Sequence, residues 1–490
     1  MGLPDHAICC RALATRDARF DGRLFVGVAT TGVYCRPICP ARTPRPENCR
    51  FYPSAAAAQS AGFRPCLRCR PELSPDAAAW RGTSNTVSRA LALIAEGALD
   101  EGEAGVAELA ARLGMGERQL RRLFDRHLGV PPVAVAQTRR VLFAKQLIQD
   151  SALPMTAVAA AAGFGSVRRF NAVFRRLYGR TPSELRRRRR ASPSALRLRL
   201  AYRPPYDWDA IAEFLAARAV EGVELVERGV YWRTLAIDGA CGSVAVAPGR
   251  GCLVATIRLP ELRGLLAIVG RLRRLFDLDA DVLAIGSHLR GDAGLAPLVA
   301  RRPGLRAPGS WDGFELAVRA ILGQQISVAA ARRLAGRLTA LAGAPLAADL
   351  TGHERLTRAF PTPERIAALD LSGVGMPRAR SAALQALARA AQADAALFAP
   401  GCGSEQALER LAALPGFGPW TLQYWALRAL RDSDAFPAGD VALRRSSAVA
   451  NGSPLSPHAL LARAEAWRPW RAYAAQHLWT ADSLERSSHA

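Results

Sequence analysis

Residues 414–421 read LPGFGPWT and lie between two stretches of helical patterning. Gly416 and Gly418 permit a tight turn with free backbone N–H groups, and a helix is expected to begin near Trp420. Such N–H groups at a helix start suit a phosphate group, although Pro-Gly-x-Gly also occurs in ordinary turns. Asp440 follows 22 residues after Gly418, beyond the expected helix and a loop.

Size and hydrophobic content bound the architecture. A chain of 490 residues is too long for one hydrophobic core and predicts three or four domains. Hydrophobic residues make up 50% of the chain, so each domain can bury a core. No apolar run reaches the roughly 18 residues of a membrane-spanning helix. Residues 1–16 also lack the apolar segment of a signal peptide. We therefore expect an intracellular protein.

The formal net charge of +24 predicts a polyanionic partner, and DNA is the usual one. Lys145 is the only lysine, and all the other positions in the Lys and Arg count are arginine. A GC-rich coding bias would explain the choice of arginine over lysine. It would not explain the excess of basic over acidic residues, so nucleic-acid binding remains the expectation.

Four of the ten cysteines form two close pairs. Three residues separate Cys35 from Cys39, two separate Cys66 from Cys69, and 26 residues lie between the pairs. Two such pairs can place four thiolates around one ion, and tetrahedral zinc prefers this ligand set. A purely structural zinc knot is one alternative. A disulfide framework is another, which suits an intracellular chain less well.

The segments around these pairs resemble a known domain. TTGVYCRPICPAR at 30–42 and AGFRPCLRCRPE at 61–72 are similar to the N-terminal zinc domain of the Ada family of bacterial adaptive-response proteins. The resemblance implies that Cys35 accepts a methyl group from a DNA methylphosphotriester, while Cys39, Cys66 and Cys69 remain zinc ligands. Acceptance would be stoichiometric, because the resulting thioether has no evident route back to a thiol.

The chemistry of such a site also provides a switch. The nucleophile is a thiolate, which bound zinc keeps deprotonated at neutral pH. Four thiolates on a divalent ion leave two net negative charges, and methylation of one sulfur removes one of them. Weaker repulsion from phosphates would then raise the affinity for DNA. The resemblance places Thr31, Arg42 and Arg68 near the DNA backbone, whereas Leu67 replaces a basic residue of the best-known member.

Residues 84–190 contain an internal repeat. AELAARLGMGERQLRRLFDRHLGVPP, which ends at 132, matches VAAAAGFGSVRRFNAVFRRLYGRTP, which ends at 182, at an offset of 50 residues. Each copy has an alanine four residues before a glycine, Ala110 with Gly114 and Ala159 with Gly163. In a helix-turn-helix motif a small alanine lets two helices approach and the glycine supplies the turn. A plain helical bundle is the alternative, which the duplication disfavours.

The second helix of each copy is expected at 117–127 and 166–178. Arginines on these helices can reach phosphates or base edges. They are Arg118, Arg121 and Arg122 in the first copy and Arg168 and Arg169 in the second. The whole stretch resembles an AraC-type DNA-binding domain, and GRTPSELRR at 179–187 resembles its usual ending. Residues 186–194, RRRRRASPS, are expected to form a linker.

The remainder of the chain combines strand-like and helical patterns. Alternation in TLAIDG, SVAVAPG and LVATIRL predicts strands between 197 and 259, and helical patterning then continues to the end. Five segments in order resemble the AlkA-type 3-methyladenine-DNA glycosylase II of the helix-hairpin-helix superfamily. They are YRPPYDW (202–208), FLAARAVEGVE (214–224), RAILGQQISV (319–328), LPGFGPWT (414–421) and WRPWRAYAAQHLW (467–479), and the resemblance covers about residues 196–483.

This resemblance implies the chemistry. Asp440 has the spacing of the superfamily's catalytic aspartate. A base alkylated on a ring nitrogen is often cationic and leaves readily, so the carboxylate chiefly has to stabilise the cationic sugar. The base must leave the stack and enter a pocket. The resemblance lines that pocket with Trp420, Tyr424 and Trp479, whose electron-rich faces attract a cation. Core packing is the alternative role for these rings.

Gln325 occupies the wedge position that is leucine in the best-known relative, and whether Gln325 or Ile326 fills the gap in the duplex is left open. No lysine lies beyond Lys145, so the lyase activity of bifunctional relatives is not expected. No cysteine follows Cys402, so no C-terminal iron–sulfur cluster is expected. The Pro-Cys-His-Arg methyltransferase site of Ada has no counterpart. One zinc ion is the expected cofactor, with a monovalent cation at the hairpin as a further candidate.

These patterns predict a multidomain, mostly α-helical protein. It comprises a small α+β zinc domain at 1–80, an all-α double helix-turn-helix domain at 84–190, an α+β subdomain at 196–300 and an all-α helix-hairpin-helix glycosylase domain at 301–490. The expected function is DNA alkylation repair by a monofunctional glycosylase joined to a methyl acceptor. Two other interpretations stay open: a methylation-sensing transcription regulator with an inactive glycosylase-like tail, and a zinc-stabilised architectural DNA binder.

The expected partners follow from the same resemblances. They are double-stranded DNA that carries alkylated bases or methylphosphotriesters, promoter DNA and RNA polymerase, with no membrane partner. The expected location is the bacterial cytoplasm, in association with the nucleoid.

Overall fold

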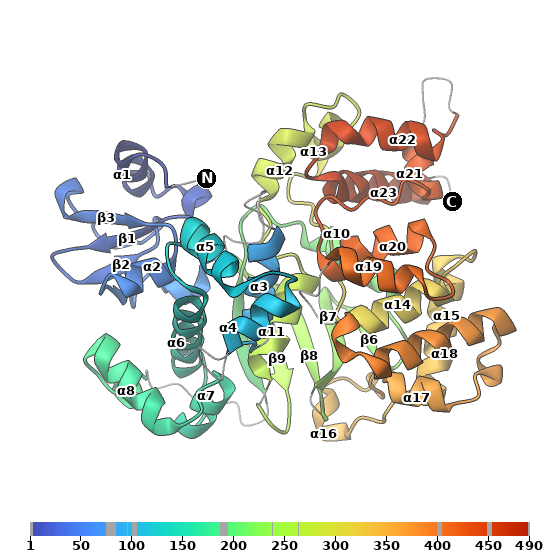
Figure 1. The fold of residues 1–490 in the computed structure, drawn as a ribbon, viewed down its shortest axis with the longest axis horizontal. Coiled ribbons are helices and arrows are strands. Elements are labelled where there is room, and N and C mark those ends of the chain that lie inside the picture. Colours follow the sequence, from blue (N-terminus) through green and yellow to red (C-terminus); the bar gives the residue numbers. More distant parts are fainter. Residues whose placement is uncertain are drawn as a thin grey trace. The chain divides into compact units, whose positions relative to one another are not determined.

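The computed structural model describes residues 3–74, 85–95, 97–99, 105–186, 195–237, 239–262, 264–398, 404–447 and 453–488. The chain divides into two compact units (Figure 1). The first unit comprises Met1–Arg203, Arg250–Ile257 and Glu261–Gly270, and the second comprises Pro204–Gly249, Arg258–Pro260 and Arg271–Ala490. Within the described ranges, no helix has both the length and the apolar character needed to cross a bilayer. Most of the predicted linker, residues 187–194, lies outside the described residues.

The first unit begins with a small four-stranded sheet. Its strands are β1 (Phe25–Val28), β2 (Val33–Cys35), β3 (Cys49–Tyr52) and β4 (Arg64–Pro65), in the order β3-β1-β2-β4. Strand β1 pairs antiparallel with β2 and β3, whereas β2 and β4 are parallel. Helices α1 (His6–Ala14) and α2 (Ala55–Ser60) accompany the sheet. A β-carbon on Gly27 would lie 2.9 Å from the rings of Phe63 and Tyr52, so close ring packing requires glycine there.

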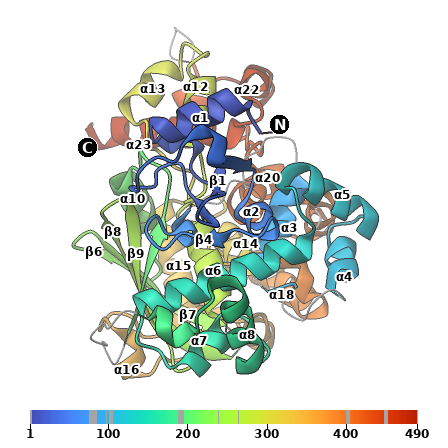
Figure 2. The same ribbon diagram turned by 90° about the vertical axis from the view of Figure 1, so that its left-hand side faces the viewer.

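The predicted duplication is present as two helix-turn-helix motifs. The first is formed by α4 (Gly105–Arg112) and α5 (Glu117–Leu128), and the second by α7 (Met155–Ala161) and α8 (Val167–Tyr178). The long helix α6 (Pro132–Asp150) joins them, with contacts to α2, α5 and α7, and Figure 2 shows its course through the first unit. Helices α3 (Asn85–Ala95) and α9 (Pro182–Leu185) flank the pair. Phe124 and Phe174, which match in the two copies, are both fully buried.

Strands beyond the helix-turn-helix motifs follow the alternation in the sequence. Strand β5 (Leu196–Ala201) pairs antiparallel with β9 (Cys252–Arg258). In the second unit, β6 (Glu224–Glu227), β7 (Val230–Ile237) and β8 (Ala240–Gly249) form an antiparallel meander. Helix α10 (Trp208–Arg218) contacts β6 and β7. Buried ion pairs then tie the meander to α14 (Gly313–Leu322), because Arg233 on β7 pairs with both Glu224 and Glu315.

The helical body of the second unit surrounds one apolar core. Leu338, Leu384, Leu387 and Trp425 are completely buried in it. The main helices are α15 (Val328–Ala342), α18 (Arg378–Ala393), α19 (Ser404–Ala412), α20 (Pro419–Trp425), α21 (Val441–Ser446), α22 (Pro457–Ala464) and α23 (Arg471–Ser488). Helix α14 contacts α15, α18 and α20 around this core, and α21 contacts α23. The structure therefore confirms the mostly helical, multidomain class.

Candidate functional sites

Asp440 lies at the start of α21, where its side chain caps the helix. Its Oδ1 atom accepts a hydrogen bond from the backbone N–H of Leu443 at 3.0 Å. Two indole N–H groups also converge on the carboxylate: Nε1 of Trp420 donates to Oδ2 at 3.0 Å, and Nε1 of Trp479 donates to Oδ1 at 3.0 Å. These three neutral donors fix the orientation of the carboxylate.

The three predicted pocket rings lie together beside this carboxylate. Trp420 and Tyr424 are one helical turn apart on α20 and stack with ring centroids 5.2 Å apart and an interplanar angle of 7°. Trp479, on α23, meets Tyr424 edge to face at 6.3 Å. All three side chains are only partly buried, in contrast to the fully buried Trp425 on the same helix. Partial burial next to a carboxylate distinguishes them from rings that only fill a core.

A buried cation that the sequence did not single out lies against these rings. The guanidinium of Arg428 is 5.6 Å from the Tyr424 centroid, 5.1 Å from that of Trp479 and 4.6 Å from that of Phe214. It donates to the carbonyl of Pro308 at 2.7 Å and to Gln476 Oε1 at 2.9 Å. Burial lowers the pKa of Arg428 to about 10. One arginine among many gives no local signal in the sequence, so only the packing identifies it.

A hydrogen bond joins the hairpin to the loop that contains Gln325. Gly416 has φ +90°, a conformation that suits glycine, and its carbonyl accepts a hydrogen bond from Nε2 of Gln324 at 2.5 Å. Arg380 donates to the Gln324 carbonyl at 2.7 Å. The next residue, Gln325, is exposed and has φ +59°, which is uncommon for a side chain larger than glycine. Ile326 beside it is 36% exposed.

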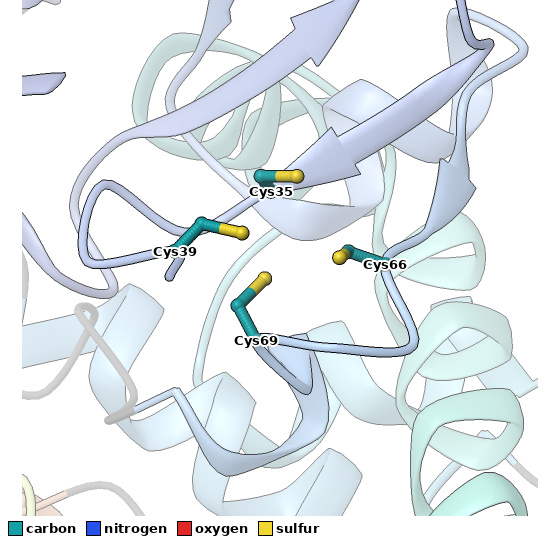
Figure 3. Close-up of side chains that lie close together, drawn as sticks. All are labelled: Cys35, Cys39, Cys66 and Cys69. Atoms are coloured by element: carbon teal, nitrogen blue, oxygen red, sulfur yellow. The ribbon is translucent and has the colours of Figure 1, made fainter. Parts of the chain in front are cut away.

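The four paired cysteines converge on one point (Figure 3). Their Sγ atoms all lie within 4.8 Å of one another, and in the described part of the chain this is the one cluster of three or more potential metal ligands. Four thiols with no carboxylate or imidazole among them fit zinc in a closed tetrahedral site. Cys39, Cys66 and Cys69 are buried, whereas Cys35 is only half-buried and is the most accessible of the four.

The side chains predicted to contact DNA are mostly exposed. In the sheet domain this holds for Thr31, Arg42 and Arg68, and in the helix-turn-helix motifs it holds for Arg118, Arg168 and Arg169. Arg121 differs, because it is partly buried and pairs with Glu117 on the same helix at 2.6 Å. Exposure is a necessary condition for a DNA contact and leaves each of these contacts a prediction.

Four family models match the chain in the order that the sequence predicts. The metal binding domain of Ada matches residues 8–72, and a helix-turn-helix domain matches 109–188. The AlkA N-terminal domain matches 197–312, which includes β5 and β9 as well as the meander. The HhH-GPD superfamily of base excision DNA repair proteins matches 318–472, the part that contains the hairpin and Asp440.

Known proteins resemble either the whole chain or its C-terminal part. A probable bifunctional transcriptional activator/DNA repair enzyme AlkA of Mycobacterium tuberculosis is 43% identical over 97% of this chain and 96% of its own length. The DNA-3-methyladenine glycosylase 2 of Escherichia coli is 38% identical over 57% of this chain and 95% of its own. The solved 3-methyladenine DNA-glycosylase from Archaeoglobus fulgidus has the same fold, with TM-score 0.52 and 24% identity over 58% of this chain and 98% of that one.

Proposed function

This chain belongs to the family of bifunctional transcriptional activators and DNA repair enzymes of the AlkA type, and on that premise we propose how its residues act. It is a DNA alkylation repair protein. Its C-terminal part hydrolyses the N-glycosidic bond of alkylated bases, and its N-terminal part is a methyl acceptor with one zinc ion held by four cysteines. The proposed domain limits are 1–80, 84–190, 196–300 and 301–490.

Asp440 is the proposed catalytic residue of base removal. The observation that carries this assignment is the pair of indole N–H donors that hold its two oxygens beside the aromatic rings. As the glycosidic bond breaks, positive charge develops on the sugar, and a fixed carboxylate stabilises that charge without reorganising. The alkylated base, already a good leaving group, departs into the pocket lined by Trp420, Tyr424 and Trp479.

The reaction is proposed to end in hydrolysis. A lyase would need an amine that attacks the sugar, and the sequence has no lysine beyond Lys145. The product is therefore an abasic site in an uncut strand, with water taking the place of the base. Gln325 is the proposed wedge, because its exposed side chain projects from a loop fixed to the hairpin through Gln324.

Cys35 is the proposed methyl acceptor of the N-terminal part. When zinc is bound, it keeps the four thiols deprotonated at neutral pH. The Cys35 sulfur attacks the methyl carbon of a methylphosphotriester, an S–C bond forms, the C–O bond breaks, and the phosphodiester leaves with its negative charge. The greater exposure of Cys35 relative to its three partners supports this choice.

The partners follow from the DNA-binding parts of the family. Double-stranded DNA is the common partner, and the proposed ligands are DNA with alkylated bases or methylphosphotriesters and promoter DNA. Contacts to the backbone are assigned to Thr31, Arg42 and Arg68 and to the exposed arginines of α5 and α8, with the Gly416–Gly418 hairpin on the C-terminal side. We also propose RNA polymerase as a protein partner and a monovalent cation as a ligand of the hairpin. The proposed location is the bacterial cytoplasm, in association with the nucleoid.

A base-release assay tests the role of Asp440. Duplex DNA carrying 3-methyladenine is incubated with excess wild-type protein or Asp440→Asn, and free base is measured over time. Loss of the charge is expected to slow release by about 100-fold or more. Asp370→Asn, in an exposed loop where the carboxylate accepts hydrogen bonds from Ser372, is the matched control with unchanged rate. Equally slow release by the wild type and Asp440→Asn would instead favour a regulator with an inactive tail.

Mass spectrometry tests the role of Cys35. After incubation with DNA that contains methylphosphotriesters, one added methyl group is expected on the peptide with Cys35 and none elsewhere. Cys10→Ser is the control, because Cys10 lies outside the four-cysteine cluster. Full occupancy of the site by zinc without any methylation would leave only the structural zinc knot.

A further inference from the structure

The zinc domain and the helix-turn-helix domain share one hydrophobic core. Ala56 and Ala57 of α2 are buried in the same cluster as Leu120 and Phe124 of α5. Ser54, which caps α2, also donates through Oγ to the carbonyl of Leu128 at the end of α5, at 2.7 Å. The two domains are therefore packed against each other through a shared core within the first unit, and are not separate domains joined only by a linker.

Lys145 extends this interface to the four-cysteine site. It lies on α6 and is completely buried. Its Nζ atom donates to the backbone carbonyl of Cys66 at 3.0 Å and to Glu72 Oε2 at 2.6 Å. Cys66 is itself one of the four converging thiols. A side chain of the DNA-binding domain thus contacts the backbone of the loop that supplies two metal ligands.

A second ion pair, with a largely buried carboxylate and a partly buried guanidinium, lies at the end of the same loop. Arg70, which follows Cys69, donates to both carboxylate oxygens of Asp150 at the end of α6, at 3.0 and 2.9 Å, and also to Glu72. Arg70 has φ +54°, so its backbone is held in a conformation that costs energy. The network contains two cations, Lys145 and Arg70, and two anions, Glu72 and Asp150, so its charges balance. A largely buried network of this kind fixes the geometry of the interface more than it adds to the free energy of unfolding.

We infer that Lys145 is a positioning residue for the methyl-accepting centre, supplied by the DNA-binding domain. By holding the Cys66 carbonyl, it fixes the loop from Cys66 to Cys69 so that the thiols keep their metal-binding geometry. The metal site is complete only while α6 is docked, and by reciprocity the loss of the metal loosens α6. This inference rests on the proposed role of the zinc domain, but the metal-binding readouts do not depend on methyl transfer.

Two charge-balanced double variants of the full chain separate the effects. Lys145→Met with Glu72→Gln removes the contact to Cys66. Arg70→Met with Asp150→Asn removes the other pair at the same interface and leaves that contact intact. Release of zinc to a coloured chelator is expected to be at least about tenfold faster in the first variant, as for other groups that orient metal ligands, and little changed in the second. Equal release by both variants would overturn the inference.

Two further readouts accompany the zinc measurement. The thiolate-to-metal absorption of the cobalt-substituted protein is expected to shift in the first variant only. The far-ultraviolet circular dichroism of both variants is expected to match that of the wild type, which excludes a general loss of folding. An unchanged cobalt spectrum in the first variant would also contradict the inference. If wild-type Cys35 takes up no methyl group while the zinc and cobalt results hold, the proposed methyl transfer fails and the positioning role stands.

The single lysine provides a direct measure of docking. An acetylating reagent for amines can modify only Lys145 and the terminal amine, and the terminal amine serves as the internal standard. In the zinc-loaded chain Lys145 is expected to react at least about 100-fold more slowly than after chelation, because reaction requires local opening. Equal reactivity in the two states would show that the metal and α6 are not linked.

Discussion

Trp420 and Trp479 each serve two partners through different parts of one side chain. The indole N–H edge of each donates to Asp440, while the ring faces stack on or abut Tyr424. A base held against these faces and the carboxylate that assists its departure would therefore be positioned by the same two residues. Arg428 lies over the rings of Tyr424 and Trp479, where its positive charge competes for their electron-rich faces and weakens the attraction for a cationic base.

Replacing either tryptophan by phenylalanine separates the two roles. Trp420→Phe and Trp479→Phe keep an aromatic ring but remove one donor from Asp440. Each is expected to reduce the single-turnover rate of base release by about 10- to 100-fold with a smaller change in DNA affinity. Trp208→Phe is the matched control, since its indole N–H bonds the Gly229 carbonyl at 3.1 Å, away from Asp440. A fall in affinity alone would contradict the positioning role.

His477 gives the second unit a defined sensitivity to acid. Burial lowers its pKa from 6.5 to about 4 and outweighs the charge of Asp207, which acts in the opposite direction. Between these values the unfolded chain binds a proton that the folded chain does not, so stability decreases as pH falls from 6.5 towards 4. The loss is about 1.4 kcal/mol per pH unit within that window. Urea unfolding followed by fluorescence at pH 7 and pH 5 should show this slope for the wild type.

His477→Gln is the test of that assignment. The variant has no titrating group at this position, so its stability should change less between pH 7 and pH 5 than that of the wild type. An identical pH dependence of the two proteins would assign the acid sensitivity to other groups.

Some residues of the sites can be predicted from the sequence and others cannot, for a physical reason. Asp440 and the four cysteines are recognisable because short spacings in the chain determine where they lie. The direction of the two indole N–H groups and the place of Arg428 depend on contacts that α20 and the turn directly after it make with α23, which lies much farther along the sequence. No local pattern encodes those contacts, so only the folded chain reveals them.

At the scale of elements, the duplication offers a comparison between equivalent positions. Gly129 and Gly179 end α5 and α8, with φ +73° and +63°. Beyond Gly179 there is open space, whereas a β-carbon on Gly129 would lie 3.2 Å from Cγ of Pro53 and 3.5 Å from Cβ of Ala57. The two motifs therefore share a backbone requirement and differ in what surrounds it.

Alanine at these two glycines is expected to have unequal effects. The free energy of unfolding of both variants should fall by about 1–2 kcal/mol, because an L-residue is disfavoured in the left-handed region. For Gly129→Ala it should fall by about 1 kcal/mol more, because the added methyl group presses on Pro53 next to α2. Thermal unfolding of the two variants measures the difference. Equal losses of stability would indicate that Pro53 and Ala57 can move away from the added methyl group without an energetic penalty.

The elements themselves were largely predictable, since periodicity marks them. The expected helices at 117–127 and 166–178 correspond to α5 and α8, and the alternating segments correspond to β7, β8 and β9. The sequence did not predict that α2 would join the core of the first helix-turn-helix motif. An alanine-rich turn of helix carries no sign of its partner, and its burial follows from the shared interface.

At the scale of the whole molecule, the two activities should be separable. Removal of zinc by a strong chelator at neutral pH is expected to abolish methyl uptake at Cys35, because structural zinc contributes directly to folding of its domain. Base release should stay within about twofold, since among the described residues no cluster of three or more potential metal ligands lies at the proposed pocket. Both activities are measured on the same preparation, and re-addition of zinc should restore methyl uptake. A parallel loss of base release would show that the C-terminal part depends on the zinc domain.

The distribution of basic side chains has a consequence beyond docking. With its one lysine enclosed between domains, the permanent positive charges that the protein's side chains offer to DNA are all guanidinium groups. A guanidinium stays protonated at any pH a cell reaches, and acyl-transferring enzymes that neutralise lysine have no substrate on such a surface. The attraction of this chain for nucleic acid is therefore expected to be constant across alkaline conditions and beyond the reach of lysine acylation. Methylation of Cys35 is then the one modification proposed here that would change the affinity of the chain for DNA.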